Sequence, residues 1–312
     1  MLDEKIRSRA EAQQYRLVGS HSAVKICHWT KKSLTDEGFC YKQKFYGTES
    51  HRCCQMTPSL FCPNRCLYCW RSIELFSGRK IIGRINDPEE IVDGCISQHR
   101  ILINGFPGNE KINMKKFKEA QNPNMFAISL TGEPTLYPEL DGIIDELRKR
   151  NIMSFLVSNG QLPEKIKNLQ CMPTQLYISL DAPTKEIYKK IDKPMFPDFW
   201  ERLSKTLDLI PSLGCRTALR ITAVKNLNMV KPEEYAKLIK KANPMFVEVK
   251  GYMWVGESRK RLKESNMPTH KEVMGFAKKI SESTGYKISE EKKESTAVLL
   301  ADRNCKNRLI KG

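Results

Sequence analysis

Short apolar runs alternate with amphipathic stretches along most of the chain. The apolar runs are five to eight residues long and are bounded by turn-forming residues, which is typical of buried strands. We predict strands near 57–61 and at 125–131, 152–157, 176–180, 217–224 and 246–250, with helices at 87–103, 137–151, 184–191, 198–210, 232–242 and 269–284. Strands that alternate with helices form parallel sheets. About six βα units are too few for a closed eight-stranded barrel. The predicted fold is therefore α/β, a partial and open parallel β/α barrel.

Breaks in this pattern divide the chain into three predicted parts. Asp87 with Glu90, and Thr269 with Glu272, have the spacing of capping boxes that begin helices. The segment at 251–268 has no periodic pattern and is long enough to be a functional loop. We predict an N-terminal extension, a barrel and a C-terminal extension, at 1–55, 56–290 and 291–312.

Length and charge narrow the class of protein. The chain has 312 residues, and no run of it approaches the roughly 20 apolar residues of a membrane helix. Its N-terminus is charged and lacks the apolar core of a secretory signal, so we expect a cytoplasmic protein with no membrane partner. The net charge of +17 indicates a polyanionic partner, most often nucleic acid, although a generally lysine-rich composition is the alternative. Candidates for part of an RNA-binding surface are Arg259, Lys260, Arg261 and Lys263.

Cysteines are concentrated near the N-terminus, where seven of the eleven fall between positions 27 and 69. Thiols stay reduced in the cytoplasm, so ligation of a metal or a cluster explains them better than disulfides do. Cys62, Cys66 and Cys69 form a C-x3-C-x2-C motif. Three thiolates on one short loop can bind three irons of a cubane and leave the fourth iron open. A zinc knuckle with an incomplete ligand set is the alternative.

This motif, with Tyr68 before its last cysteine, resembles the signature of the radical-SAM superfamily. Three further motifs follow in the order of that superfamily, each after a predicted strand: LTGEPT at 130–135, SNG at 158–160 and SLD at 179–181. The resemblance implies a [4Fe–4S] cluster that binds S-adenosylmethionine and cleaves it to methionine and a 5′-deoxyadenosyl radical. It also implies that the cofactor is contacted by Tyr68, Thr131, Gly132, Glu133, Ser158, Asn159, Ser179 and Asp181, with Thr131 in place of the usual first glycine.

The N-terminal cysteines indicate one family within this superfamily. Cys27, Cys40 and Cys53 are spaced by thirteen and thirteen residues, and the string VKGYMWVG begins at position 249. Together these features resemble the tRNA 4-demethylwyosine synthase family of wyosine biosynthesis. The resemblance implies a second [4Fe–4S] cluster on Cys27, Cys40 and Cys53, with the adjacent Cys54 as the alternative to Cys53. It also implies a lyase that condenses N1-methylguanosine in tRNA(Phe) with pyruvate, and an external electron donor. We expect the chain to be a monomer.

A lysine near these cysteines is expected to hold the ketoacid, because a primary amine forms a Schiff base with a ketone. Lys42 lies between two of the cysteines and is the first candidate. Lys44 is the second, because alternate residues share one side of an extended chain. For either lysine, binding to a tRNA phosphate at the surface is the alternative. A guanine that leaves its stack needs an aromatic partner, and Trp70 and Trp254 are candidates.

Two other functions fit parts of this pattern. One is another two-cluster radical-SAM enzyme that acts on a protein, such as an activase of glycyl-radical enzymes. The other is a zinc-dependent RNA-binding protein without enzymatic activity. The net charge of +17 favours RNA over a protein as the substrate. The colour of anaerobically purified protein would separate zinc from iron–sulfur clusters, because the clusters are brown.

Overall fold

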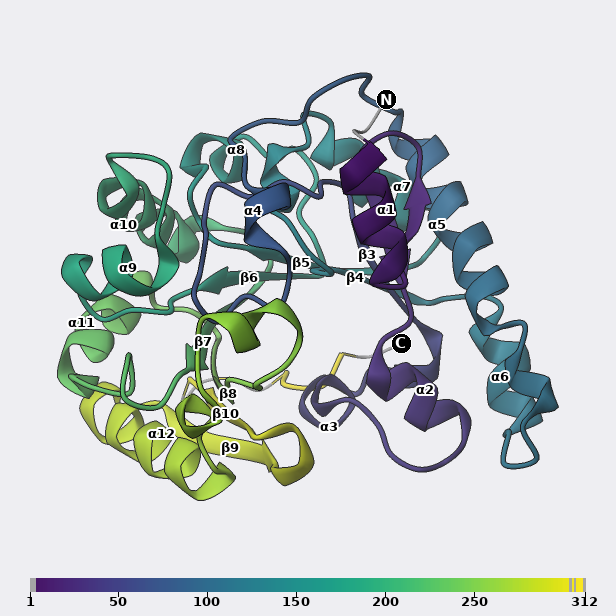
Figure 1. Ribbon diagram of the computed structural model, residues 1–312. Helices are drawn as coiled ribbons and strands as arrows, with labels where there is room; N and C mark the ends of the chain where they lie inside the picture. Colours follow the sequence, from purple (N-terminus) through teal and green to yellow (C-terminus); the bar gives the residue numbers. More distant parts are fainter. Residues whose placement is uncertain (1–3, 303–304, 306, 311–312) are drawn as a thin grey trace.

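In a computed structural model, which describes residues 4–302, 305 and 307–310, the strands form a single sheet of ten. Their bounds are β1 Arg16–Val18, β2 Ser22–Lys25, β3 Cys53–Thr57, β4 Met125–Ile128, β5 Met153–Ser158, β6 Gln175–Ser179, β7 Arg216–Ala223, β8 Phe246–Gly251, β9 Lys287–Lys292 and β10 Ala297–Ala301. The order is β1-β2-β3-β4-β5-β6-β7-β8-β10-β9, and β3 to β8 pair in parallel. Within the described residues β1 and β9 are the two edge strands and do not pair with each other, so the barrel is open (Figure 1). The six predicted βα units are confirmed.

The helices surround this sheet, with α5 to α12 on its outer side (Figure 1). Their bounds are α1 Glu4–Ala12, α2 His28–Leu34, α3 Tyr41–Tyr46, α4 Ile73–Phe76, α5 Pro88–Ile103, α6 Met114–Ala120, α7 Leu140–Lys149, α8 Pro163–Lys167, α9 Lys185–Asp192, α10 Phe199–Leu209, α11 Pro232–Ala242 and α12 His270–Thr284. The capping box of Thr269 and Glu272 is confirmed. The capping box predicted at Asp87 is wrong, because this N-cap side chain makes no capping hydrogen bond. None of the described helices has the length and apolar character needed to span a bilayer.

The first predicted strand is wrong by four residues: β3 occupies Cys53–Thr57 instead of 57–61. β3 pairs in parallel with β4 and antiparallel with β2, and it ends where Pro58 has no N–H to donate to a ladder. The division into 1–55, 56–290 and 291–312 stays a prediction, and β3 and β9 run across its two boundaries. Of the predicted extensions, residues 1–3, 303–304, 306 and 311–312 lie outside the described residues.

The two faces of the sheet have separate apolar cores, because successive side chains of a strand point to opposite faces. The outer face packs against the helices with residues such as Cys54, Phe126, Leu156, Leu176, Leu219 and Val247. The inner face carries the neighbouring residues Cys53, Met125, Phe155, Tyr177, Ala218 and Phe246, and it packs against Tyr41, Phe45 and Tyr46 of α3. Helix α3 therefore covers part of the concave side of the open barrel.

Candidate active site

A cavity of about 470 Å³ on the inner face of the sheet collects almost all the predicted site residues. Its wall includes both predicted cysteine triads, Cys27, Cys40 and Cys53 with Cys62, Cys66 and Cys69. The wall also includes Lys42 and every residue predicted to contact S-adenosylmethionine, namely Tyr68, Thr131, Gly132, Glu133, Ser158, Asn159, Ser179 and Asp181. Segments from the N-terminus, the barrel and the loop after β8 thus meet around one space.

The second triad lies on a loop that follows β3 and is fixed by backbone and arginine contacts. Backbone hydrogen bonds tie this loop to residues 191–195 and to 76–78. Arg71, 2% exposed, donates from Nη1 and Nη2 to the carbonyl oxygens of Phe76 and Asn64, at 2.7 and 2.8 Å, and from Nε to the Cys69 sulfur at 3.2 Å. Arg261 donates to the carbonyl oxygens of Leu67, at 3.2 Å, and Cys69. Two arginines therefore hold the turns of the loop.

The thiols of this loop fit a cluster by their surroundings. Burial raises the pKa of Cys62 to about 11 and raises the pKa of Cys66 well above its usual range, so both thiols keep their protons at neutral pH in the absence of metal. Polar donors point at the sulfurs: the backbone N–H of Asn64 and Nδ2 of Asn159 lie 3.4 and 3.5 Å from the Cys62 sulfur. Iron would displace the thiol protons, and these N–H donors would then stabilise the thiolates.

Glu133 joins the turns after β4 and β5. Its side chain is 1% exposed, and Oε1 accepts hydrogen bonds from the backbone N–H and hydroxyl of Thr135 and from the Ser158 hydroxyl, at 2.6 to 3.1 Å. Oε2 accepts one hydrogen bond, from the Asn159 N–H at 2.8 Å, which leaves a lone pair for an ammonium group. Gly132 has φ +68°, and a Cβ there would lie 1.8 Å from the Ser59 carbonyl oxygen. This close approach requires glycine.

Tyr68 lies beneath the loop between two buried carboxyl groups. Its hydroxyl is 2.7 Å from Oδ2 of Asp181 and 2.6 Å from Oδ1 of Asp192. Burial, together with the charge of Asp181, raises the pKa of Asp192 to about 8, which favours the protonated form of its carboxyl group. Oδ1 of Asp192 also accepts from the Cys66 thiol at 3.2 Å. Sequence reasoning missed Asp192, which ends an amphipathic helix and has no motif to mark it.

The N-terminal triad is assembled from three separate elements. Cys27 is the N-cap of α2, Cys40 is the N-cap of α3, and Cys53 is the first residue of β3. Burial, together with the nearby Cys27, raises the pKa of Cys40 to about 12. Cys53 lines the cavity, whereas Cys54 faces the outer core and lies 4.0 Å from the Cys95 carbonyl oxygen. The alternation of the strand thus favours Cys53 over Cys54 as a ligand.

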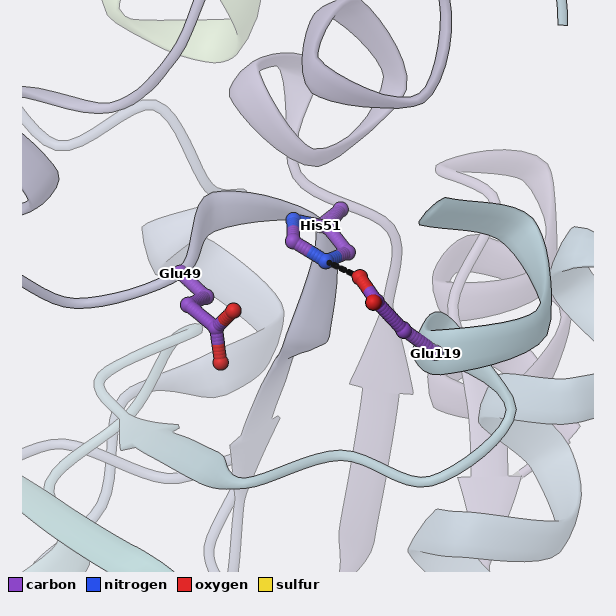
Figure 2. Close-up of side chains that lie close together, drawn as sticks. All are labelled: Glu49, His51 and Glu119. Carbon is purple, nitrogen blue, oxygen red and sulfur yellow. Dashed lines mark hydrogen bonds and ion pairs between the residues drawn. The ribbon is translucent and has the colours of Figure 1, made fainter. Parts of the chain in front are cut away.

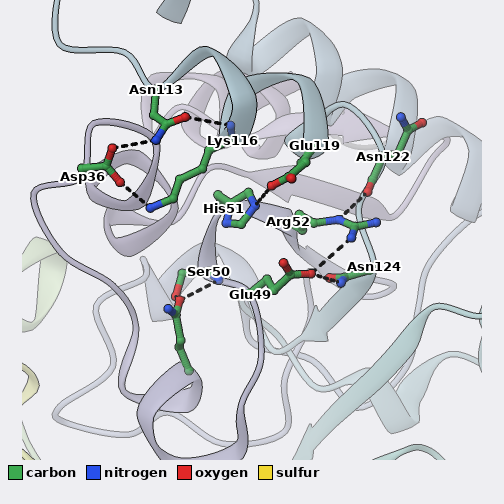
Figure 3. Close-up of polar contacts among 11 residues, drawn as sticks. Asp36, Glu49, Ser50, His51, Arg52, Asn113, Lys116, Glu119, Asn122 and Asn124 are labelled. Atoms are coloured by element: carbon green, nitrogen blue, oxygen red, sulfur yellow. Dashed lines mark hydrogen bonds and ion pairs between the residues drawn. The ribbon is translucent and has the colours of Figure 1, made fainter. Parts of the chain in front are cut away.

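A polar network holds the short helix at 50–52 that leads into Cys53. His51 Nε2 is 2.7 Å from Oε2 of Glu119 on α6, as Figure 2 shows, with Glu49 on the other side of the imidazole. Figure 3 shows that Glu49 accepts from Asn124 and from Arg52, at 2.5 and 3.2 Å. Both carboxylates are already engaged by the chain's own donors. We therefore interpret this group as structural, holding the start of β3 against α6.

The two candidate lysines point in different directions. Lys42 is 7% exposed, and its Nζ lies 5.0 Å from the ring centroids of both Phe155 and Tyr177 on the inner face. Lys44 points to the surface, where its Nζ lies 3.0 Å from Oε1 of Glu290. The extended chain assumed for residues 42 to 44 is wrong, because α3 is a helix and residues two apart in a helix lie on different sides. The geometry favours Lys42 over Lys44 as the lysine that could hold a ketoacid in the cavity.

Two basic residues of the cavity wall, Arg220 on β7 and Lys250 on β8, were missed from the sequence. Arg220 is directly opposite Glu248, and Lys250 is opposite Thr222, so all four side chains leave the sheet on its inner face. Polar residues at every second position of otherwise apolar strands were the available signal, since this spacing marks a polar inner face.

The residues expected to bind RNA have mixed positions. Arg261 is turned inward to the cysteine loop, which contradicts a purely surface role. Lys260 pairs with Glu257 at 2.8 Å, and the guanidinium of Arg259 lies 4.3 Å from the ring of Trp254. The exposed Lys263 stays a candidate, as do Arg259 and Lys260. Of the two tryptophans, Trp70 lines the cavity.

Comparison with known families agrees with this geometry. Residues 110–239 match the family described as Radical SAM superfamily, and residues 241–302 match the family described as Wyosine base formation. The open barrel, together with these matches, defines a radical-SAM enzyme.

The particular family follows from full-length similarity. A protein of Pyrococcus abyssi is 47% identical over 304 residues, which cover 96% of this chain and 89% of the relative. A protein of Homo sapiens is 40% identical over 308 residues, covering 98% of this chain and 42% of the relative. Both are named S-adenosyl-L-methionine-dependent tRNA 4-demethylwyosine synthase. The chain belongs to this family.

Two solved structures have the same fold over the whole chain. One, described as TYW1 with a lysine-pyruvate adduct bound, has a TM-score of 0.88 and 36% identity, and the match covers 99% of this chain and 98% of that one. The other, described as archaeal TYW1, has a TM-score of 0.82 and 35% identity, covering 99% and 100%. Family membership implies dependence on S-adenosylmethionine and an iron–sulfur cluster, and it favours the tRNA-modifying function over the two alternatives.

Proposed function

We propose that this enzyme condenses N1-methylguanosine in tRNA(Phe) with pyruvate to form 4-demethylwyosine. The observation that carries the proposal is the position of Lys42, whose side chain lines the same cavity as both cysteine triads. A reactive amine there can present a ketoacid to a radical made on the other side of the cavity. The lysine–pyruvate adduct named for the related structure supports the same reaction for this lysine.

The chemistry at Lys42 is an amine–ketone condensation. The neutral amine attacks the keto carbon of pyruvate, a C–N bond forms, one proton is taken up, and the ketone oxygen leaves as water. The product is a cationic imine between the rings of Phe155 and Tyr177, each 5.0 Å from Nζ. The faces of aromatic rings attract a cation, and their apolar surface limits hydrolysis of the imine. Lys42 thus holds the ketoacid as an electrophile.

Residues at the other end of the cavity are proposed to hold the cofactors. Cys62, Cys66 and Cys69 would bind a [4Fe–4S] cluster, which supplies the electron that cleaves S-adenosylmethionine. Oε2 of Glu133 would accept a hydrogen bond from the ammonium group of the methionine part, and the turns of Thr131, Gly132, Ser158, Asn159, Ser179 and Asp181 would enclose the rest. Tyr68, fixed by two carboxyl groups, supports the loop from below.

A second [4Fe–4S] cluster on Cys27, Cys40 and Cys53, an external electron donor and a monomeric state are parts of the same proposal. The common cavity wall of these three cysteines supports the second cluster. Light scattering of the reconstituted protein tests the monomer. Reduction of the clusters by a separate flavodoxin or ferredoxin, in place of dithionite, tests the donor.

The deciding experiment is anaerobic incubation with methylated tRNA, pyruvate, S-adenosylmethionine and dithionite, followed by mass spectrometry of the nucleosides. We expect 4-demethylwyosine only when all four are present. Borohydride with labelled pyruvate should then fix the label on Lys42, and the Lys44→Ala variant is the matched control, which should label as the native protein does. Label on Lys44, or product from Lys42→Ala at the native rate, would contradict the role of Lys42.

A further inference from the structure

Two cations in the cavity wall have no assigned role in the proposed reaction. Arg220 and Lys250 extend from the inner face of β7 and β8, and both line the cavity as half-buried side chains. Across the part of the chain that the structure describes, neither side chain makes a hydrogen bond or an ion pair, although their backbone groups bond within the sheet. Buried charges are normally paired, because removal from water without a partner is unfavourable. An anion brought by a ligand would supply the partner.

The nearby acid, Glu248, is not the ionic partner of these two cations. Glu248 lies opposite Arg220 in the sheet and is fully buried. Its Oε1 accepts a hydrogen bond from the Tyr46 hydroxyl at 2.6 Å, on the side of α3, and its side chain does not line the cavity. The carboxylate is thus bound by Tyr46 of α3, whereas the two cations line the cavity.

We propose that Arg220 and Lys250 bind the carboxylate of the ketoacid whose ketone reacts with Lys42, an inference that rests on the proposed function. A guanidinium beside an ammonium is a charge-assisted donor pair that matches the two oxygens of a carboxylate. The carboxylate of S-adenosylmethionine has the same chemistry and is the other possible source. The test therefore has separate arms for the two molecules.

The location of the cations favours the ketoacid. Lys42 Nζ lies 5.0 Å from the ring centroid of Tyr177 on β6, and Tyr177 is opposite Ala218, which precedes Arg220 by two residues on the same face of β7. The turns expected to bind the methionine group lie instead beside the Cys62 sulfur, which Nδ2 of Asn159 approaches at 3.5 Å. A molecule of three carbons with a ketone next to its carboxylate suits a reactive amine flanked by such donors.

The test compares two ketones on the reconstituted enzyme. Pyruvate and hydroxyacetone both condense with an amine, but hydroxyacetone has no carboxylate. Borohydride trapping on Lys42 is measured against concentration for the native enzyme, Arg220→Gln and Lys250→Gln. Arg220→Lys and Lys250→Arg keep the charge, and Lys240→Gln removes an exposed charge on α11 as the control. Binding of S-adenosylmethionine is measured by equilibrium dialysis in each variant.

We expect the half-saturating pyruvate concentration to rise about tenfold or more in each Gln variant, as loss of a charge-assisted hydrogen bond implies. Trapping of hydroxyacetone and binding of S-adenosylmethionine should stay at the native level, and the charge-retaining variants should recover part of the loss. The proposal would be overturned if the half-saturating concentrations of both ketones rose equally. It would also be overturned if binding of S-adenosylmethionine weakened while trapping of pyruvate stayed normal.

Failure of the amine chemistry itself is distinguishable. If no lysine of the native enzyme is labelled, the role of Lys42 is wrong, and dialysis with labelled pyruvate replaces trapping in the same variants. Weaker pyruvate binding in Arg220→Gln and Lys250→Gln would then still support a carboxylate site. Native binding in both would overturn it.

Discussion

The two cysteine triads are built in opposite ways. Cys62, Cys66 and Cys69 lie within eight residues on one loop, and the arginines Arg71 and Arg261 hold its carbonyl oxygens. The N-terminal triad is spread over 27 residues, and each cysteine begins a different element. The loop triad depends on local geometry, whereas the N-terminal triad forms only when α2, α3 and β3 have packed together.

This difference teaches where each triad is vulnerable. Local ligands approach each other in any conformation that keeps the loop closed, so we expect metal to bind the loop triad even when distant packing is disturbed. Distant ligands must first be brought together by the fold, which carries the entropy of closing two longer loops. We therefore expect damage to packing to affect the N-terminal triad first.

The largest effect is expected at the loop triad. Cys66→Ala should abolish formation of 5′-deoxyadenosine, because one ligand of the proposed cofactor-binding cluster is lost. The matched substitution in the other triad, Cys40→Ala, should leave this cleavage measurable while product formation stops. Chromatography of the nucleoside after anaerobic reduction measures both. Normal yield from Cys66→Ala would break the contrast between the triads.

The next effect sharpens the assignment of ligands in the N-terminal triad. Replacing Cys27, Cys40 and Cys53 together by Ala should remove about half the iron, if each triad holds a cluster of four irons. Cys54→Ala should keep its iron, since that side chain faces the outer core. Iron analysis and the visible spectrum report the result. Full iron in the triple variant would contradict the second cluster.

A smaller effect is expected at Arg261, which connects the loop after β8 to the cysteine loop. Arg261→Ala should speed loss of iron to a chelator about fivefold, because its hydrogen bonds to Leu67 and Cys69 are lost. Lys260→Ala is the neighbouring control, since Lys260 pairs with Glu257 and leaves the loop untouched. Equal rates in the two variants would show that Arg261 is dispensable for the loop.

The smallest effect is expected at His51. His51→Gln should lower the midpoint of thermal unfolding by a few degrees, because the contact with Glu119 that holds the start of β3 is weakened. The iron of the N-terminal triad should be lost more readily than that of the loop triad. Lys237→Gln, which removes an exposed ion pair on α11, serves as the control and should leave both quantities unchanged.

The sequence predicted what local patterns determine. Six parallel strands, the six predicted helices to within three residues and the order of the motifs followed from short-range periodicity and from resemblance, whereas the shorter helices α2, α3, α4, α6 and α8 and the N-terminal α1 were not predicted. The position of β3 did not, because CCQMT and TPSLF are both short apolar runs and pairing with β2 and β4 decides between them. The inward turn of Arg261 and the cations Arg220 and Lys250 depend on contacts between distant segments, which periodicity does not encode.

The opposite orientations of Cys53 and Cys54 have a consequence for oxidative damage. Neighbouring cysteines on a strand cannot form a disulfide with each other while the strand keeps its hydrogen bonds, since their sulfurs lie on different sides of the sheet. An oxidant that enters the cavity after loss of iron therefore meets Cys53 and leaves Cys54 reduced behind the sheet. Oxygen-inactivated protein should contain Cys53 as sulfenic acid or as a disulfide to Cys27 or Cys40, with Cys54 as a free thiol.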